Sequence, residues 1–284
     1  MKKVFPIRGL SLLFLMIGVV GCTNLKHVNR FSTSSLDGLQ KFEEIEYGFK
    51  HHCLNNCREN AFHNLDLRAA NCDCKMDQKA DQATLKIYRA IKGYLDGLGK
   101  LSDNELTEYK LNALNEALTE GEFGGLRLEK KEVEAHSRVV GLLLRAFTDG
   151  YRKDKLKTYV REANAPLQVL LDYLNLNLAQ NLDGKLRVQK QRLENRYLDL
   201  VRESDLSDYE RLKAVEEYYQ KLDDLSQKQE AIAAYTKALK KIAEGHQKLN
   251  DQIDQVTAVE IKDALVHYGS EIQDIISEFN KIKE

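Results

Sequence analysis

Apolar residues recur at intervals of three and four along most of the chain, which is the spacing typical of an amphipathic α-helix. The pattern predicts a succession of helices separated by short polar or glycine-containing breaks. We expect helices over residues 35–60, 75–98, 102–120 and 128–149, followed by longer ones over residues 166–200, 207–249 and 257–279.

The two longest predicted helices lie in the C-terminal half. The first carries a leucine-rich stripe from Leu167 to Leu200. Its repeat of roughly 3.67 residues per turn indicates nearly straight packing rather than a heptad zipper. Pro166 would suit the first turn of this helix, where a missing N–H costs nothing, and Gly184 is its weak point.

A second apolar stripe follows after a short polar turn. Ser207 and Glu210 have the spacing of a capping box, in which each side chain bonds to the other residue's backbone N–H. A short connection between long helices makes them antiparallel neighbours. The positions expected to form the buried stripe are Leu212, Val215, Tyr219, Leu222, Leu225, Ile232, Tyr235, Leu239, Ile242 and Leu249.

Composition agrees with a helical fold. The chain of 284 residues contains two prolines, Pro6 and Pro166, and no tryptophan. Leucine, alanine, glutamate, lysine and glutamine, all strong helix formers, are abundant. We therefore expect an all-α, elongated antiparallel helical bundle, with one region over residues 35–150 and a long-helix region over residues 151–284.

The first 22 residues follow a different pattern. Lys2, Lys3 and Arg8 precede an apolar run over residues 9–20, and Gly21-Cys22 comes directly after it. That run is too short to span a membrane as a helix, which takes about 20 residues. A positive segment, a short apolar segment and a small residue are the parts of a secretory signal peptide.

With cysteine after the small residue, this segment resembles the signal of bacterial lipoproteins. The resemblance implies that residues 1–21 are removed and that Cys22 carries acyl chains, which would anchor a soluble body firmly to a membrane. Residues 22–34 would form the lipidated end and a polar tether. Thr23, rather than aspartate, after the cysteine favours the outer membrane if the host is Gram-negative.

Four further cysteines, Cys53, Cys57, Cys72 and Cys74, fall within a short stretch. An even number of cysteines in an exported protein usually forms disulfides. Cys53 and Cys57 share one face of a predicted helix, and a chain that folds back on itself meets in nested order. We therefore favour the pairs Cys53–Cys74 and Cys57–Cys72, which would staple a helical hairpin, although spacing leaves the other pairings open.

A metal site is the alternative use of the same cysteines. His51, His52 and His63 lie nearby and would add imidazole ligands. Structural zinc sites more often contain Cys-x2-Cys pairs, whereas this cluster has Cys-x3-Cys and Cys-x-Cys. The sequence thus favours disulfides and no metal, with a metal- or ligand-binding lipoprotein as the second hypothesis.

No catalytic motif accompanies these features. The chain lacks Gly-x-Ser-x-Gly, His-Glu-x-x-His and a phosphate-binding Gly-Lys-Ser/Thr loop. Its net charge of −1 offers no global attraction for nucleic acid. We therefore expect a non-enzymatic envelope lipoprotein without a cofactor, whose helical faces bind a protein partner.

Overall fold

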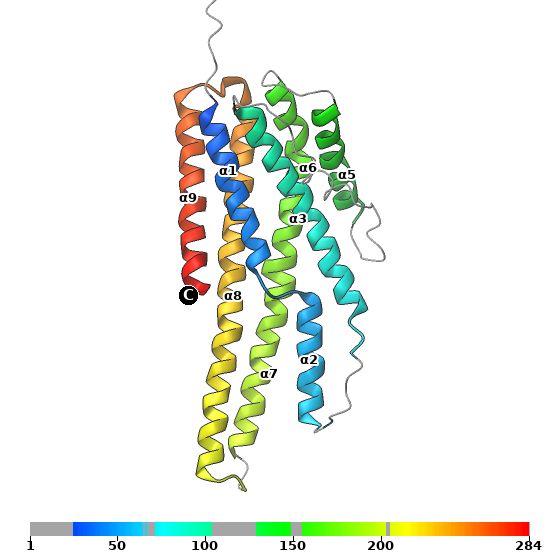
Figure 1. Cartoon of the computed structure of the whole chain (residues 1–284), viewed down its shortest axis with the longest axis vertical. Helices are drawn as coiled ribbons and strands as arrows, with labels where there is room; N and C mark the ends of the chain where they lie inside the picture. The colour runs from blue at the N-terminus through cyan, green and yellow to red at the C-terminus, as the bar shows by residue number, and fades with distance from the viewer. Residues whose placement is uncertain are drawn as a thin grey trace, which may run out of the picture.

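The computed structural model describes residues 25–64, 66, 72–103, 129–148, 155–202 and 205–283. In this part of the chain, helices of the α, 3₁₀ and π types are joined by short connections, and no strand occurs. The helices run along a common axis and form an elongated bundle (Figure 1). The prediction of an all-α antiparallel bundle is confirmed.

The described α-helices differ in length, from 15 residues in α1 and α2 to 44 in α8. Their bounds are α1 Lys26–Gln40, the 3₁₀ turn η1 Lys41–Glu44, α2 Phe49–His63, α3 Lys75–Ser102, α5 Lys130–Thr148, α6 Leu156–Leu176, the π-helical segment η3 Asn177–Leu182, α7 Asp183–Arg202, α8 Asp208–Asp251, the 3₁₀ turn η4 Ile253–Gln255 and α9 Val259–Lys283.

The core of the bundle forms around α1, which packs against α3, α8 and α9. Two glycines, Gly38 of α1 and Gly245 of α8, permit this close approach. A Cβ at Gly38 would lie 2.8 Å from Ile272 Cγ2 of α9, and one at Gly245 of α8 would overlap the Phe31 ring. The N-terminal helix thus shares one core with the C-terminal helices.

The predicted tether over residues 22–34 is wrong from Lys26 onward, because this segment already forms α1. Val28 and Phe31 are fully buried. The polar residues that resembled a linker are used inside the bundle, where Ser32 Oγ donates a hydrogen bond to the Leu95 carbonyl of α3. The Ser32 hydroxyl thus bonds to a helix carbonyl instead of facing water.

The predicted helix over residues 35–60 is likewise two helices. α1 ends at Gln40, the turn η1 follows, and residues 45–48 are not helical before α2 begins. Ser102, the first residue of the predicted helix over residues 102–120, is instead the last residue of α3 and donates to the Gly99 carbonyl. The rest of that predicted helix, from residue 104 onward, lies outside the described residues.

The long leucine-rich helix is continuous but begins earlier than predicted. Helical structure extends from Leu156 to Arg202 through the π-helical segment η3. Pro166 is therefore buried inside α6 rather than in its first turn. α7 and α8 are packed neighbours joined by a tight turn. The capping box is confirmed, because Ser207 Oγ accepts from Glu210 N at 3.3 Å and Ser207 N donates to Glu210 Oε2 at 2.8 Å.

A polar network inside the bundle joins three helices, α3, α6 and α8. Tyr94 Oη lies 2.6 Å from His246 Nε2, and Asn164 Oδ1 lies 3.0 Å from His246 Nδ1. Asn164 Nδ2 donates to Gln247, so its Oδ1 accepts from His246 Nδ1–H. His246 Nε2 must then accept from the tyrosine. This arrangement needs a neutral ring, and burial lowers the pKa of His246 to about 3.

The two ends of the long axis carry different parts of the chain. His27 Nε2 donates to the Val256 carbonyl at 2.7 Å, so the start of α1 lies where α8 ends. α8 has 44 residues, which corresponds to roughly 66 Å. The turn between α7 and α8 is at the opposite end, where these two helices extend beyond the others (Figure 1).

Candidate functional site

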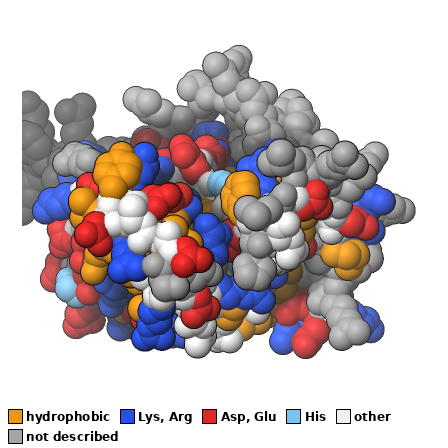
Figure 2. All heavy atoms as spheres, turned by 90° about the horizontal axis from the view of Figure 1, so that it is seen from below, with side chains coloured by type: hydrophobic (Ala, Val, Ile, Leu, Met, Phe, Trp, Pro, Cys, Tyr) orange, Lys and Arg blue, Asp and Glu red, His pale blue; other side chains and the backbone are white. Residues whose placement is uncertain are grey.

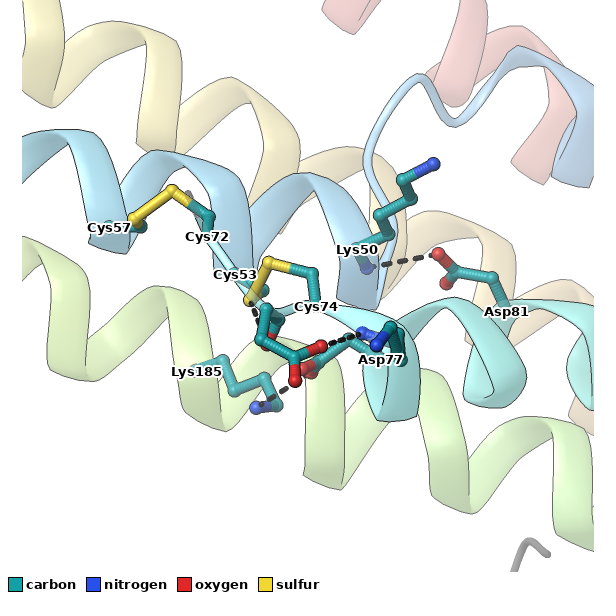
Figure 3. Close-up of a disulfide and its surroundings, with 10 residues drawn as sticks. Lys50, Cys53, Cys57, Cys72, Cys74, Asp77, Asp81 and Lys185 are labelled. Carbon is teal, nitrogen blue, oxygen red and sulfur yellow. Dashed lines mark hydrogen bonds and ion pairs between the residues drawn. A yellow bond between two sulfur atoms is a disulfide. The ribbon is translucent and has the colours of Figure 1, made fainter. Parts of the chain in front are cut away.

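The cysteine cluster forms two disulfides between α2 and the start of α3. Cys53 pairs with Cys74 and Cys57 with Cys72, with Cα–Cα distances of 5.9 and 6.0 Å, within the usual range for a disulfide. Figure 3 shows both bridges beside the Lys185–Asp77 ion pair, which links α7 to α3. The predicted nested pairing is confirmed.

The N-terminus of α2 is fixed by a carboxylate from α3. Asp81 Oδ1 accepts from Phe49 N at 2.8 Å, and Asp81 Oδ2 accepts from Lys50 N at 3.0 Å (Figure 3). These are free N–H groups of the first helical turn. Burial raises the pKa of Asp81, and the two backbone hydrogen bonds partly oppose that shift. A Cβ at position 48 would lie 2.7 Å from Asp81 Oδ1, so a larger residue there would displace this carboxylate.

Polar side chains also join α2 to α7. Tyr47 Oη donates to Gln189 Oε1 at 2.9 Å, and Gln189 Nε2 donates to Glu59 Oε1 at 2.7 Å. Because the tyrosine has one proton, His52 Nδ1, at 2.8 Å, must donate to Tyr47 Oη. Among the described side chains of α2, only Phe49 is buried. Covalent and polar links, rather than apolar packing, therefore hold this helix.

The metal alternative finds little support in this arrangement. All four sulfur atoms are used in disulfides, and a metal ligand would have to be a thiolate. Within the described ranges, no group of three or more His, Cys, Asp or Glu side chains is placed to hold a metal ion. The side chain of His63 lies outside those ranges.

The end of the bundle farthest from α1 exposes an apolar face of α8. Four residues at helical spacing form this face, which we call the tip stripe. Their exposed fractions are 71% for Tyr209, 62% for Leu212, 38% for Val215 and 57% for Tyr219. In a typical amphipathic helix such a stripe faces the core. Here it faces away from Ala214 and Leu225, which are buried on α8.

Acidic residues surround the tip stripe. Residues 205–224 contain seven acidic and three basic side chains, which leaves a formal charge of −4. Figure 2, which views the molecule from this end, shows hydrophobic side chains at the surface among acidic and basic ones. On α7, Leu198 is also exposed. An exposed apolar patch with a charged rim is typical of a protein-binding surface.

The sequence pattern placed Leu212, Val215 and Tyr219 in the buried stripe, so the exposed surface was missed. One signal distinguishes the two halves of the helix. Ala231, Ala234 and Ala238 of the second half are buried and let neighbouring helices approach closely. The first half, residues 208–229, has three tyrosines and six acidic residues but only one alanine, Ala214.

Comparisons with known proteins found no match. No family model, no curated protein and no solved structure resembles the chain. None of the described helices combines the length and the apolar character needed to cross a membrane. Cys22 and the segment resembling a lipoprotein signal lie outside the described residues.

Proposed function

We propose that this protein is an envelope lipoprotein, attached through Cys22, that binds a protein partner with the tip stripe and has no enzymatic role. The observation that carries the proposal is the exposure of Tyr209, Leu212 and Tyr219 on a single face of α8. Aromatic residues with an apolar neighbour are the side chains most often found at the centre of protein interfaces.

The geometry of the bundle supports this role. A lipid on Cys22 would lie close in sequence to His27, which bonds to the Val256 carbonyl just beyond the C-terminal end of α8. The tip stripe is at the other end of that helix, roughly 66 Å away for 44 residues. An anchored molecule would therefore hold its binding face away from the lipid surface. In a host with two membranes, that surface would be the outer membrane.

The two disulfides fit an extracytoplasmic compartment. Disulfides form and persist in oxidising environments and are rare in the cytosol. Both bridges join helix segments rather than surround a cleft with reactive groups, which supports a structural role for the cysteines.

The anchor is tested by replacing Cys22 in the full chain expressed in a bacterial host. Wild-type protein should fractionate with membranes and carry a mass increment for acyl chains on Cys22. Cys22→Ser should release soluble protein of normal melting temperature, because the helical body does not need the lipid. A wild-type chain without any acyl mass would refute the lipoprotein assignment.

The binding face is tested by site-specific photo-crosslinking in the same host. A photoreactive residue at Leu212 should give one discrete crosslinked species. The matched control is Lys240, which is exposed on the same helix outside the tip stripe. Equal labelling at both positions, or labelling of lipid alone at Leu212, would argue against a protein partner at the tip.

A further inference from the structure

A second feature of the molecule is separate from the tip stripe. A cavity of 760 Å³ opens where the chain passes from α1 to α2. Its volume lies in the range of small-molecule binding pockets, roughly 300–1,000 Å³. Neither the cysteine pairing nor the proposed partner interaction accounts for it.

Three elements supply the walls, and the apolar side chains face inward from each of them. Residues 42–49 form one wall with Phe42, Ile45 and Phe49. Leu85 of α3 forms another. The floor comes from Leu178 and Leu182, which belong to the π-helical segment η3. Short π-helical segments are frequent at functional sites.

α2 closes the cavity with one face. Lys50, Leu54 and Arg58 are four residues apart and all three line the cavity, as expected for side chains on one side of a helix. Leu54 extends the apolar wall, and the two cations flank it. Lys50 and Arg58 form no ion pair with the described residues.

The acidic groups at the cavity are mostly engaged. Glu43 accepts from Tyr88 and from Lys92, which lowers the pKa of Glu43. Asp81 binds the two amides at the start of α2. Lys50 also interacts electrostatically with Asp81 and lowers the pKa of that carboxyl. His51 Nδ1 donates to the Glu46 carbonyl, and the Glu46 carboxylate lines the cavity as well. Lys50 and Arg58 nevertheless place two cationic groups next to the apolar interior.

We propose that this cavity binds a single-chain amphiphile with an anionic headgroup, of which a long-chain carboxylate is the simplest example. The chain would occupy the apolar interior, and the carboxylate would lie between Lys50 and Arg58. Burial of methylene groups supplies affinity, and a charge-assisted hydrogen bond supplies selection for the anion.

The links that hold α2 give the cavity a fixed shape. Two disulfides join α2 to α3, the Asp81 cap fixes the first turn, and Tyr47 joins the connecting segment to α7. A wall held in this way loses little conformational freedom when a ligand enters, which favours binding.

The test is calorimetric titration of the full chain carrying Cys22→Ser, so that no anchor lipid competes for the cavity. Dodecanoate should bind saturably with a stoichiometry of one. Dodecanol, which has the same chain without the charge, should bind about tenfold more weakly, in keeping with the loss of a charge-assisted interaction. Equal affinity for both ligands would refute the anionic part of the proposal.

Variants locate the binding. Leu54→Trp should narrow the cavity at α2 and weaken dodecanoate binding, and Lys50→Gln with Arg58→Gln should weaken it about tenfold. Lys75→Gln with Lys79→Gln, two exposed cations of α3 that do not line the cavity, should leave affinity unchanged. Melting temperature checks that each variant folds. Unchanged affinity in folded Leu54→Trp, or no saturable binding by the parent, would overturn the proposal. Neither result depends on the partner at the tip stripe.

Discussion

The two halves of α8 have the same helical pattern and opposite surroundings. In the half nearest α9, Ile232, Tyr235, Leu239 and Ile242 are almost completely buried. In the half nearest the turn, Leu212 and Tyr219 continue the spacing of threes and fours but lie on the opposite face of the helix and are exposed. Apolar periodicity therefore predicts the helix, whereas the face that is buried depends on which other helices extend alongside.

The difference follows from the lengths of the neighbours. α9 ends before the turn of the α7–α8 hairpin, and α1 covers only the upper part of α8 (Figure 1). α7 is the neighbour that accompanies α8 to the tip, and it covers one side. The tip stripe is therefore left exposed.

Alanine substitutions on the two halves should give the largest contrast. Ile242→Ala should lower the free energy of unfolding by about 2–5 kcal/mol, because it leaves a cavity in a fully packed core. Leu212→Ala should change it by less than about 0.5 kcal/mol. Urea unfolding of both variants measures the difference. Similar losses for the two would mean that the tip stripe is covered within the monomer.

Removing a disulfide should show how much α2 depends on covalent links. Cys57→Ser with Cys72→Ser opens a loop of 15 residues and should cost about 2–4 kcal/mol. The melting temperature should fall by roughly 2–4 °C per kcal/mol. The remaining bridge, seen in a non-reducing peptide map, is the control. An unchanged melting temperature would mean that polar contacts alone hold α2.

Acid should destabilise the folded protein through His246, which lies in the buried half of α8. Its folded pKa, about 3, is below the value near 6.5 in the unfolded chain. Above pH 6.5 the His246 ring is neutral in both the folded and the unfolded chain. As the pH falls from 6.5 toward 3, only the unfolded chain binds the proton, so the free energy of unfolding decreases across that range. Between pH 7 and pH 4.5 the wild type should lose about 2–3 kcal/mol more than His246→Gln.

Urea unfolding at the two pH values measures that difference. His27 and His136 also have lowered pKa values because of burial, so both proteins should lose some stability. Only the excess in the wild type reports on His246. Parallel losses in the two proteins would contradict a neutral, buried ring.

Two glycine substitutions should have small effects of opposite sign. Gly245→Ala should destabilise by about 1–3 kcal/mol, because the new methyl group overlaps the buried Phe31 ring. Gly184→Ala has open space around the new methyl and should stabilise helix α7 by about 0.5–1 kcal/mol. Thermal unfolding compares them. Stabilisation by Gly245→Ala would show that α1 packs less closely on α8.

Local chemistry was the part of the fold that the sequence predicted well. The capping box at Ser207 and Glu210, the start of α3 at Lys75 and the nested disulfides all depend on residues close together in the chain. The wrong predictions concern long-range packing. Ser32 was predicted to lie in a polar tether because its acceptor, the Leu95 carbonyl, belongs to the distant helix α3. Pro166 was predicted to lie in a first helical turn, but it is buried inside α6.

The candidate sites follow the same division. Cysteine spacing predicted the links of α2, but the cavity needs Leu178 and Leu182, more than a hundred residues away from α2. Two asparagines are also explained only by distant partners: Asn164 of α6 binds His246 of α8, and Asn177 Nδ2 of η3 donates to Thr84 of α3. No spacing along the chain connects such pairs.

Oxidative footprinting of tyrosines, on purified protein and in intact cells, tests the proposed role of the tip most directly. In purified protein Tyr209 and Tyr219 should react readily while buried Tyr235 is protected. In cells Tyr209 and Tyr219 should become protected as the partner covers the tip stripe. Equal reactivity of these two tyrosines in cells and in purified protein would contradict a partner at this surface.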